Sequence, residues 1–284
     1  MFTNSTLKSG SLALLLATTT SQGIVVMLSD TEPPGAELET WISANFTNVT
    51  EIRHGNYADF SATASQDALL GTGPHAGNGR AEVFIIGRTL SSPAYQNVAT
   101  GYNTLPIPVV SLTAYTARQD GNRLGWHASG ATNGVPTAGA ETTVTPAGAA
   151  ILGVAPGTYD FYNSAGGTFN GLSGGTGAFG GGTILATIGT DTLAAYWAPG
   201  SAPGNTSIPG QPATFPGPRL LFNLDNDVPG GGSNDFAGFA PGNGGPVALR
   251  NAIDFATPLT AVPEPSSALL GFSTLGLLGL RRRR

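Results

Sequence analysis

Uninterrupted apolar runs recur in the first half of the chain and predict strands that are buried on both faces of a sheet. Residues 24–28, 82–87 and 107–112 are the clearest runs, and polar or turn-forming residues follow each of them. Runs of this kind are typical of parallel sheets that helices cover on both sides. Pro108 cannot donate a ladder hydrogen bond, so we expect it near the start of its strand or at a sheet edge.

Helical spacing fills the intervals between these runs and predicts the connecting helices. After a pair of prolines, apolar residues recur every three or four positions through Phe46, and residues 49–52 then predict a second strand. Residues 59–79 begin with a helical pattern and become glycine-rich, while residues 92–102 predict helix or turn. Strands that alternate with helices in this way predict a doubly wound α/β sheet.

The second half of the chain changes to shorter apolar segments separated by glycine, threonine and proline. Nine glycines occur within residues 166–182, which predicts a loop or a hairpin-rich insertion. Residues 183–188 and 193–197 flank Gly189-Thr190-Asp191 and predict a β-hairpin. Further short segments are expected at residues 142–144, 150–152 and 158–161, another strand at 219–224, and a final helix at 246–256.

This order of elements resembles class I glutamine amidotransferase-like domains, including trehalose-utilisation (ThuA-like) proteins. The stretches that carry the resemblance are residues 24–30, 83–92 and 107–112, followed by segments around Ala194, Arg219 and Leu249. The resemblance implies an α/β domain over residues 24–258 with a doubly wound, mostly parallel sheet, glycine-rich insertions and a β-hairpin in its second half. A binding site would then lie at the carboxyl ends of the strands.

The last residues of the sequence form a three-part pattern: Val262-Pro263-Glu264-Pro265, an uncharged apolar stretch, and four arginines. Residues 266–280 would span about 22 Å as a helix, short of the ~30 Å hydrocarbon core unless the bilayer thins. Arginines at this position would hold the helix end on the cytoplasmic side. The predicted membrane helix and its stop comprise Leu269, Leu270, Leu275, Leu277, Leu278, Leu280, Arg281, Arg282, Arg283 and Arg284. The alternative is a buried C-terminal helix of the globular domain.

This tail resembles the PEP-CTERM sorting signal of exported bacterial proteins. The resemblance implies recognition by an exosortase, a membrane transpeptidase that processes near the motif, so exosortase and the secretion machinery are expected partners. It divides the tail into a linker with the motif at residues 259–265 and a sorting or anchor helix with arginines at residues 266–284. Such proteins are typical of bacteria that make an exopolysaccharide matrix, which makes a matrix polysaccharide a further candidate partner.

The amino-terminal segment has the layout of a secretory signal peptide. Lys8 precedes a short apolar run at residues 12–17, and small and polar residues follow as far as Gly23. The run is too short to span a membrane. We therefore expect a signal peptide at residues 1–23 and export to the cell envelope, cell surface or extracellular matrix. A short buried first strand is the alternative.

Composition agrees with export and excludes several kinds of site. Charged residues make up 10% of the chain, the net charge is −5, and four of the twelve basic residues lie in the terminal arginine run. No basic patch remains for a nucleic-acid partner. The absence of cysteine excludes disulfides, thiolate metal sites and a cysteine nucleophile. Amidotransferase activity is therefore not expected to accompany the fold, because its nucleophile is a cysteine.

Two catalytic or phosphate-binding motifs fall in the glycine-rich stretch. The pentapeptide around Ser173, from Gly171 to Gly175, matches G-x-S-x-G, but the sequence predicts neither a strand before it nor a helix after it. Gly175, Gly177 and Gly180 match G-x-G-x-x-G without opening a predicted helix. We interpret both matches as chance, and no cofactor is expected.

A candidate pocket follows from the expected carboxyl ends of the strands. Its residues would be Asp30, Thr31, Arg88, Thr89, Ser91, Ser92 and His127, together with residues 114–118. Ser91 or Ser92, with His127 and Asp120, could form a Ser-His-Asp set. The alternative is that residues 88–92 form a polar loop that caps the next helix.

Metal ligation has one weak candidate. Asn223, Asp225 and Asp227 alternate after a strand, a pattern that can ligate calcium but lacks the glycine and glutamate of an EF-hand. The alternative is an Asx-rich turn. The histidines His54, His75 and His127 are isolated from one another, so we expect surface or loop residues and no metal site, with His127 best placed for a pocket.

These features lead us to expect an exported, surface- or matrix-associated protein whose body is a non-catalytic binding or structural domain. The alternative is an extracellular hydrolase or carbohydrate-active enzyme with its site at the carboxyl ends of the strands. A third reading is an all-β, adhesin-like body, which the content of glycine, threonine and serine alone would allow.

Overall fold

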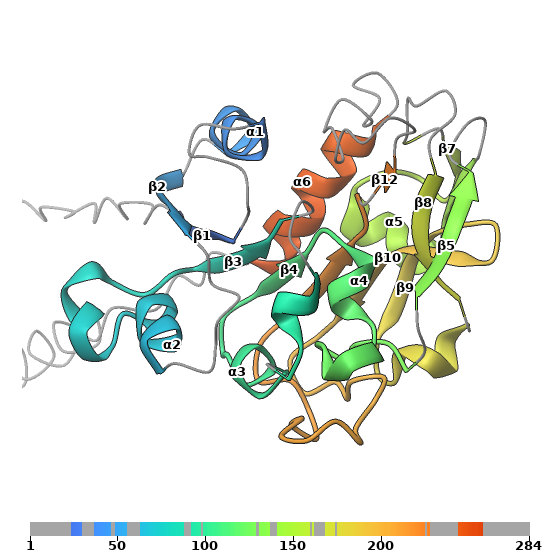
Figure 1. Cartoon of the computed structure of the whole chain (residues 1–284). Coiled ribbons are helices and arrows are strands. Elements are labelled where there is room, and N and C mark those ends of the chain that lie inside the picture. Colours follow the sequence, from blue (N-terminus) through green and yellow to red (C-terminus); the bar gives the residue numbers. More distant parts are fainter. Residues whose placement is uncertain are drawn as a thin grey trace, which may run out of the picture.

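Five parallel strands form one half of a mixed sheet in the computed structural model (Figure 1). In spatial order they are β2 (Val49–Gly55), β1 (Ile24–Ser29), β3 (Val83–Ile86), β4 (Val109–Ser111) and β11 (Arg219–Phe222). Each neighbouring pair among them is parallel. The chain thus places β2 on one side of β1 and β3 on the other, as in an open doubly wound sheet.

The other half of the sheet is antiparallel. Its main path continues from β11 through β10 (Asp191–Trp197), β9 (Thr183–Ile188), β6 (Thr142–Val144) and β7 (Gly157–Tyr159). A side branch from β10 contains β8 (Thr168–Leu172), β5 (Ala131–Pro136) and β12 (Asn226–Asp227). The mixed α/β class is confirmed, but the parallel pairing that the sequence predicts for most of the sheet ends at β11.

The structure describes residues 24–29, 37–46, 49–55, 63–87, 92–97, 99–128, 131–136, 141–159, 161, 168–173, 175–224, 226–227 and 244–257. The predicted signal peptide, the linker with Val262 to Pro265, and the predicted membrane helix with its arginines lie outside these residues. Within them, no helix is long and apolar enough to cross a membrane.

Short helices connect the strands and cover both faces of the sheet. The α-helices are α1 (Glu37–Asn45), α2 (Thr63–Leu70), α3 (Ala99–Asn103), α4 (Ala114–Ala117), α5 (Pro146–Leu152) and α6 (Gly245–Ala256). Short 3₁₀ helices are η1 (Gly73–Asn78), η2 (Ser92–Tyr95), η3 (Asp120–Asn122) and η4 (Thr176–Phe179). The predicted helices near residues 36–46 and 246–256 are therefore confirmed.

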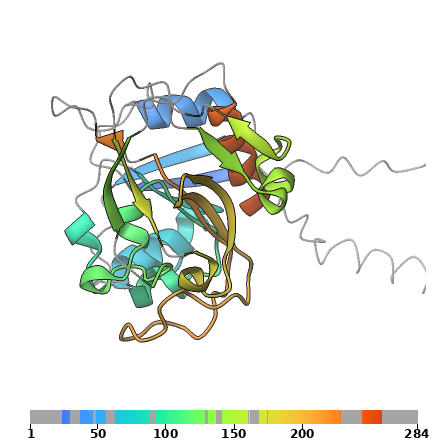
Figure 2. The same cartoon turned by 90° about the vertical axis from the view of Figure 1, so that its right-hand side faces the viewer.

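The sheet separates two hydrophobic cores. Along β1, Val26 and Leu28 face one core and Met27 faces the other, as the alternation of a pleated strand requires. Helices α1, α5 and α6 contribute to the first core, and α2, α3 and α4 to the second. Figure 2 shows α1 on one side of the blue strands and α2 on the other. A continuous apolar run is thus explained by burial on both faces.

Residues 150–152 end a helix, α5, where the sequence predicted only a short apolar segment. Thr145 caps this helix by accepting a hydrogen bond from the Gly148 amide at 2.9 Å, and Pro146 follows at the first turn. Gly153 ends it in the left-handed conformation. Threonine, proline and then glycine are ordinary start and stop signals of a helix, so the local sequence did contain this information.

Glycines in the antiparallel half permit unusually close packing. A Cβ atom on Gly148 would lie 2.0 Å from the carbonyl oxygen of Leu185, where α5 crosses β9. One on Gly182 would lie 2.4 Å from Nε1 of Trp197. Part of the glycine-rich stretch predicted as a loop or hairpin-rich insertion therefore packs tightly against buried Trp197, whose Nε1 donates to the Phe179 carbonyl at 2.8 Å.

Arg219 begins β11, the strand that joins the two halves. Its side chain is fully buried, and its two terminal nitrogens donate five hydrogen bonds of 2.7–3.1 Å to backbone carbonyls. Four of these acceptors lie in residues 102–107, at the end of α3 and in the connection from α3 to β4. Burial lowers the pKa of Arg219 to about 9, so the guanidinium remains protonated at neutral pH. The charged side chain of Arg219 thus holds the connection from α3 to β4 against β11.

Candidate functional site

The carboxyl ends of β1 and β3 meet where ligands bind in open α/β sheets. Ser29 is the last residue of β1, and its carbonyl accepts a hydrogen bond from the amide of Gly87, which follows β3, at 2.7 Å. The connection after β1 leads to β2 on one side of this point, and the connection after β3 leads to β4 on the other side. Ligand-binding crevices of open α/β sheets usually lie where the connections diverge in this way. The segments that follow Ser29 and Gly87 therefore start from adjacent positions.

These two segments contain most of the predicted pocket. Asp30, Thr31, Arg88, Thr89 and Ser91 lie outside the described residues. Ser92 is the first residue of η2. The structure thus places the starting points of both segments side by side. Among the described pocket residues, it joins His127 to the range 114–118, because the His127 amide donates to the Ala117 carbonyl at 3.1 Å.

Buried hydroxyl groups occupy the described part of this edge. The Ser29 and Tyr95 hydroxyls lie 2.8 Å apart, and both residues are fully buried. The Tyr95 ring lies against Tyr102, with ring centroids 5.3 Å apart, and Tyr102 stacks on Phe84 at 5.2 Å. Ser29 therefore joins the end of β1 to the aromatic core between the sheet and α3.

A second hydroxyl group at this edge closes the end of β4. The Ser111 hydroxyl donates to the Thr113 carbonyl at 2.9 Å and lies 2.6 Å from the Thr116 hydroxyl. Thr113 caps α4 by accepting from the Tyr115 amide at 3.2 Å. The first residues of the predicted site range 114–118 thus form a short helix with a capped start.

Asn223, the first residue of the calcium candidate, belongs to the same arrangement. Its side-chain oxygen accepts a hydrogen bond from the Ala114 amide at 3.1 Å, so the residue after β11 helps to cap α4. Asp225 lies outside the described residues, and Asp227 belongs to β12, which pairs with β8. Among the described residues no group of three or more histidine, aspartate or glutamate side chains could hold a metal ion.

His127 lies outside the helices and strands, as the expectation of a surface or loop residue allows, but it is fully buried and not on the surface. Its ring meets the Phe179 ring edge-on, with centroids 4.5 Å apart, and its backbone amide donates to Ala117 at the end of α4. Asp120, its suggested partner in a Ser-His-Asp set, lies 3.5 Å from Arg118 in an ion pair. Each of these two residues therefore has a structural neighbour of its own.

Ser173 lies between a strand and a short helix that the sequence did not predict. It follows β8 directly, and η4 begins three residues later, so the expectation of no strand before it and no helix after it is wrong. The strand is antiparallel, however, and the helix is a single 3₁₀ turn. Among the described residues other than glycine, only Asn97 and Asn122 have positive φ. Ser173 therefore lacks the strained backbone of a nucleophile elbow.

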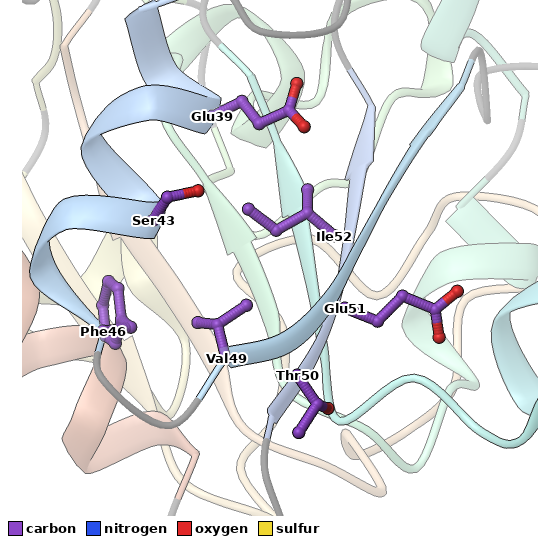
Figure 3. Close-up of a pocket in the computed structure, with 7 residues that line it drawn as sticks. All are labelled: Glu39, Ser43, Phe46, Val49, Thr50, Glu51 and Ile52. Atoms are coloured by element: carbon purple, nitrogen blue, oxygen red, sulfur yellow. The ribbon is translucent and has the colours of Figure 1, made fainter.

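A shallow depression of about 300 Å³ lies between α1 and the edge strand β2 (Figure 3). Its lining residues are Glu39, Ser43, Phe46, Val49, Thr50, Glu51 and Ile52. Sequence reasoning did not identify it, because its residues form no motif. The pairing of β2 with β1 shifts register at Thr50, between the partners of Ile24 and Val25. An irregular edge of this kind discourages the addition of a further strand.

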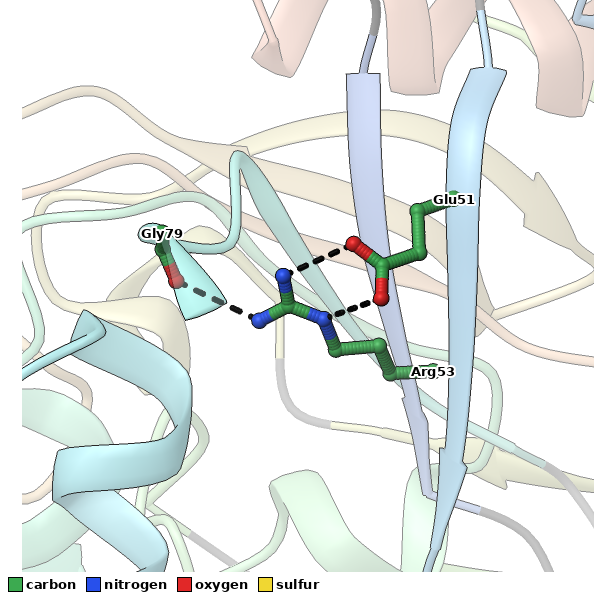
Figure 4. Close-up of polar contacts among 3 residues, drawn as sticks. All are labelled: Glu51, Arg53 and Gly79. Atoms are coloured by element: carbon green, nitrogen blue, oxygen red, sulfur yellow. Dashed lines mark hydrogen bonds and ion pairs between the residues drawn. The ribbon is translucent and has the colours of Figure 1, made fainter. Parts of the chain in front are cut away.

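Glu51, one of the two acidic residues of this depression, is paired with Arg53 (Figure 4). Arg53 donates to the two carboxylate oxygens of Glu51 at 2.8 and 2.7 Å, and to the Gly79 carbonyl at 3.2 Å. The hydrogen bond from Arg53, and its charge, hold the pKa of Glu51 below its ordinary value. The pair joins β2 to the turn after η1 and leaves Glu39 as the other acidic group of the depression.

Comparison with known proteins gives no relative from which a function could be transferred. No protein-family model matches the chain, and no curated protein sequence matches it significantly.

Proposed function

We propose that this is an exported protein that its C-terminal segment sorts to the cell surface, and that its α/β domain binds a ligand or supports the surface layer without catalysis. The single observation that carries the sorting part is the three-part pattern of Val262 to Pro265, an uncharged apolar stretch and Arg281 to Arg284. An uncharged stretch closed by arginines suits a membrane better than a protein core. Exosortase is the proposed processing partner.

We also propose that the domain is amidotransferase-like. The order β2, β1, β3, β4, β11 of its five parallel strands supports this assignment, since it is the order of an open doubly wound sheet with helices on both faces. Fold does not determine function, and the chain lacks the cysteine of that family. The proposed role of the domain is therefore binding, at the carboxyl ends of β1 and β3.

The buried hydroxyl groups at this edge of the sheet are already hydrogen-bonded within the domain, which favours a binding or structural role over catalysis. The hydroxyls of Ser29 and Ser111 are buried and bonded to Tyr95 and Thr116 within the domain. Groups held in this way stabilise the strand ends and are not poised as nucleophiles. Ligand contacts would come from the segments that follow these strands, which include Arg88.

The mass and location of the mature protein in its host test the sorting proposal. A C-terminus near Pro263 to Pro265, on protein found outside the cell, is the expected result. Replacing Pro263 and Pro265 by alanine should then abolish processing, while replacing Pro258 by alanine serves as a control outside the motif. Protein that keeps Arg281 to Arg284 and stays in the membrane fraction would make the tail an ordinary anchor and contradict the exosortase assignment.

A substrate screen separates binding from catalysis. The purified protein should bind a matrix polysaccharide without turning over ester or glycoside substrates. Turnover that Ser173→Ala abolishes, while Ser207→Ala does not, would overturn the non-catalytic assignment and favour a hydrolase. Arg88→Ala should weaken binding of the ligand, because this residue lies in the segment after β3.

A further inference from the structure

The large apolar side chains that are exposed among the described residues both lie on α6. Val247 is 54% exposed and Phe255 is 45% exposed. Their separation along the chain corresponds to about 12 Å along a helix axis. Single exposed apolar residues are common on protein surfaces, so neither residue is informative alone. Their occurrence on one helix, the last element of the described domain, indicates a role for that helix.

Helix α6 is fixed in the domain through its opposite face. Its residues in the first core are Ala248, Leu249, Ala252, Ile253 and Ala256. The side chain of Asn251 donates to the Leu152 carbonyl at the end of α5 at 3.0 Å. The outward face, which comprises the exposed residues Val247, Arg250, Asp254 and Phe255, is therefore presented to the surroundings in a fixed orientation.

The Phe255 ring is supported at the edge of this outward face. It meets the ring of Tyr196 edge-on, with centroids 5.1 Å apart. Tyr196 belongs to β10 and packs, partly buried, against the first core. Burial raises the pKa of Tyr196, so its hydroxyl is uncharged at neutral pH. A neutral hydroxyl beside an exposed aromatic ring is typical of the boundary between lipid and water.

The surface that α5 and α6 form together carries no net charge. Helix α5 has no charged residue, and on α6 Arg250 and Asp254 form an ion pair of 3.7 Å. Residues 24–257 as a whole contain sixteen acidic residues against seven arginines. An anionic bilayer therefore repels the domain in general but repels this surface least.

The position of α6 along the chain indicates which partner this surface meets. Helix α6 ends at Ala256, and the apolar stretch proposed as a membrane segment begins at Ser266. The residues between them span at most about 35 Å even when fully extended. A tether of this length keeps α6 near the bilayer and gives its exposed side chains a high effective concentration there.

We propose that the outward face of α6 docks on the lipid bilayer, with Val247 and Phe255 among the headgroups, while the C-terminal segment is inserted. This inference rests on the proposed membrane insertion of residues 266–280. Two apolar side chains bind a bilayer only weakly by themselves, and the tether makes such weak binding effective. Docking holds the linker with Val262 to Pro265 close to the bilayer surface, where a membrane transpeptidase acts.

The absence of cysteine permits single dye labels on the full chain, inserted in phosphatidylcholine vesicles. An environment-sensitive dye on Asp254→Cys reports on the outward face of α6. The same dye on Thr206→Cys, an exposed residue between β10 and β11, is the control. Brominated phosphatidylcholine quenches a dye that contacts lipid, so it should quench the dye on α6 and leave the control dye unchanged.

Substitutions on α6 should move docking in opposite directions. Val247→Ser combined with Phe255→Ser should lower the ratio of docked to undocked domain about tenfold, because less apolar surface leaves water. Val247→Trp should raise this ratio, because tryptophan favours the membrane interface. Ala213→Ser, at an exposed position between β10 and β11, is the matched control and should leave the quenching unchanged.

Resistance to extraction with alkaline carbonate measures insertion separately from docking. Protein that is extracted would overturn the proposed membrane segment together with the docking that rests on it. Retained protein whose α6 dye is quenched no more than the control dye would overturn docking alone.

A dye on α6 that reports an apolar environment but is not quenched by brominated lipid would also overturn docking. In that case a second copy of the chain, or its own tail, would cover α6. Because Val247→Trp predicts a gain, failure of the double serine variant to fold would leave the proposal open to refutation.

Discussion

The parallel and antiparallel halves of the sheet are stabilised by different kinds of contact. In the parallel half, strands such as β3 are buried along their whole length, and large apolar side chains fill both cores. In the antiparallel half, close approaches at Gly148 and Gly182 bring helix, strand and loop nearer than any side chain would allow. The stability of the parallel half therefore depends on large buried apolar side chains. The packing of the antiparallel half depends on glycines at particular positions.

This difference explains why the two halves differ in how easily the sequence reveals them. Burial on both faces leaves a continuous apolar run, which is visible in the sequence. A close backbone approach leaves only a glycine, which equally well indicates a turn or a loop. The composition of the second half, rich in glycine and threonine, is thus compatible with ordered structure.

The largest expected effect comes from the junction between the halves. Arg219→Met should lower the free energy of unfolding by about 3–5 kcal/mol, because five buried carbonyl contacts lose their charged donor. Urea unfolding followed by circular dichroism measures this loss. Arg250→Met, at an exposed position on α6, is the matched control and should change stability by less than about 0.5 kcal/mol. Equal effects of the two substitutions would show that Arg219 does not hold the halves together.

A smaller effect is expected where α5 packs on β9. Gly148→Ala should cost about 2–3 kcal/mol, because the new methyl group would lie 2.0 Å from the Leu185 carbonyl oxygen. Gly177→Ala is the control, since a Cβ there meets no atom within 4 Å. Both are measured by thermal unfolding. If Gly148→Ala is tolerated as well as Gly177→Ala, the close-packing account of the antiparallel half is wrong.

In the parallel half, the hydroxyl pair at the end of β1 should have a moderate effect. Ser29→Ala removes a partner of the buried Tyr95 hydroxyl and should cost about 1–2 kcal/mol. Combining it with Tyr95→Phe should cost less than the sum of the two single substitutions, because both members of the pair are then absent. Strict additivity in urea unfolding would mean that the two hydroxyls do not interact.

The smallest effect concerns the ion pair at the outer edge of the parallel half. Arg53 lowers the pKa of Glu51 in the folded protein. The ion pair therefore stabilises the fold at pH values above the pKa that Glu51 has in the unfolded chain. This stabilisation is lost as the pH falls through the lower pKa that Glu51 has in the folded protein. Arg53→Gln should raise the pKa of Glu51 toward its ordinary value, which NMR titration of the carboxyl carbon measures. A Glu51 titration that does not respond to the substitution would contradict the contact shown in Figure 4.

The sequence predicted the parallel strands and the final helix well, whereas most of the predicted pocket lies outside the described residues and stays a prediction. Val26 to Leu28 and the run that contains Phe84 indicated strands because their surroundings are apolar on both sides. Arg123, by contrast, has no motif around it: its burial and its hydrogen bond to the Asp120 carbonyl depend on the left-handed turn at Gly121 and Asn122. The burial of His127 against Phe179 likewise joins residues that are far apart in the chain.

By itself, the sequence determined the α/β class, most element positions and the expectation of export, because hydrophobic periodicity and terminal patterns are local properties of a chain. Only the tertiary structure decided where parallel pairing stops, at β11, and which glycines are packing contacts. It also decided that Arg219 is enclosed by backbone carbonyls. These features arise from contacts between distant segments, and the free energy of such contacts depends on neighbours that no local pattern specifies.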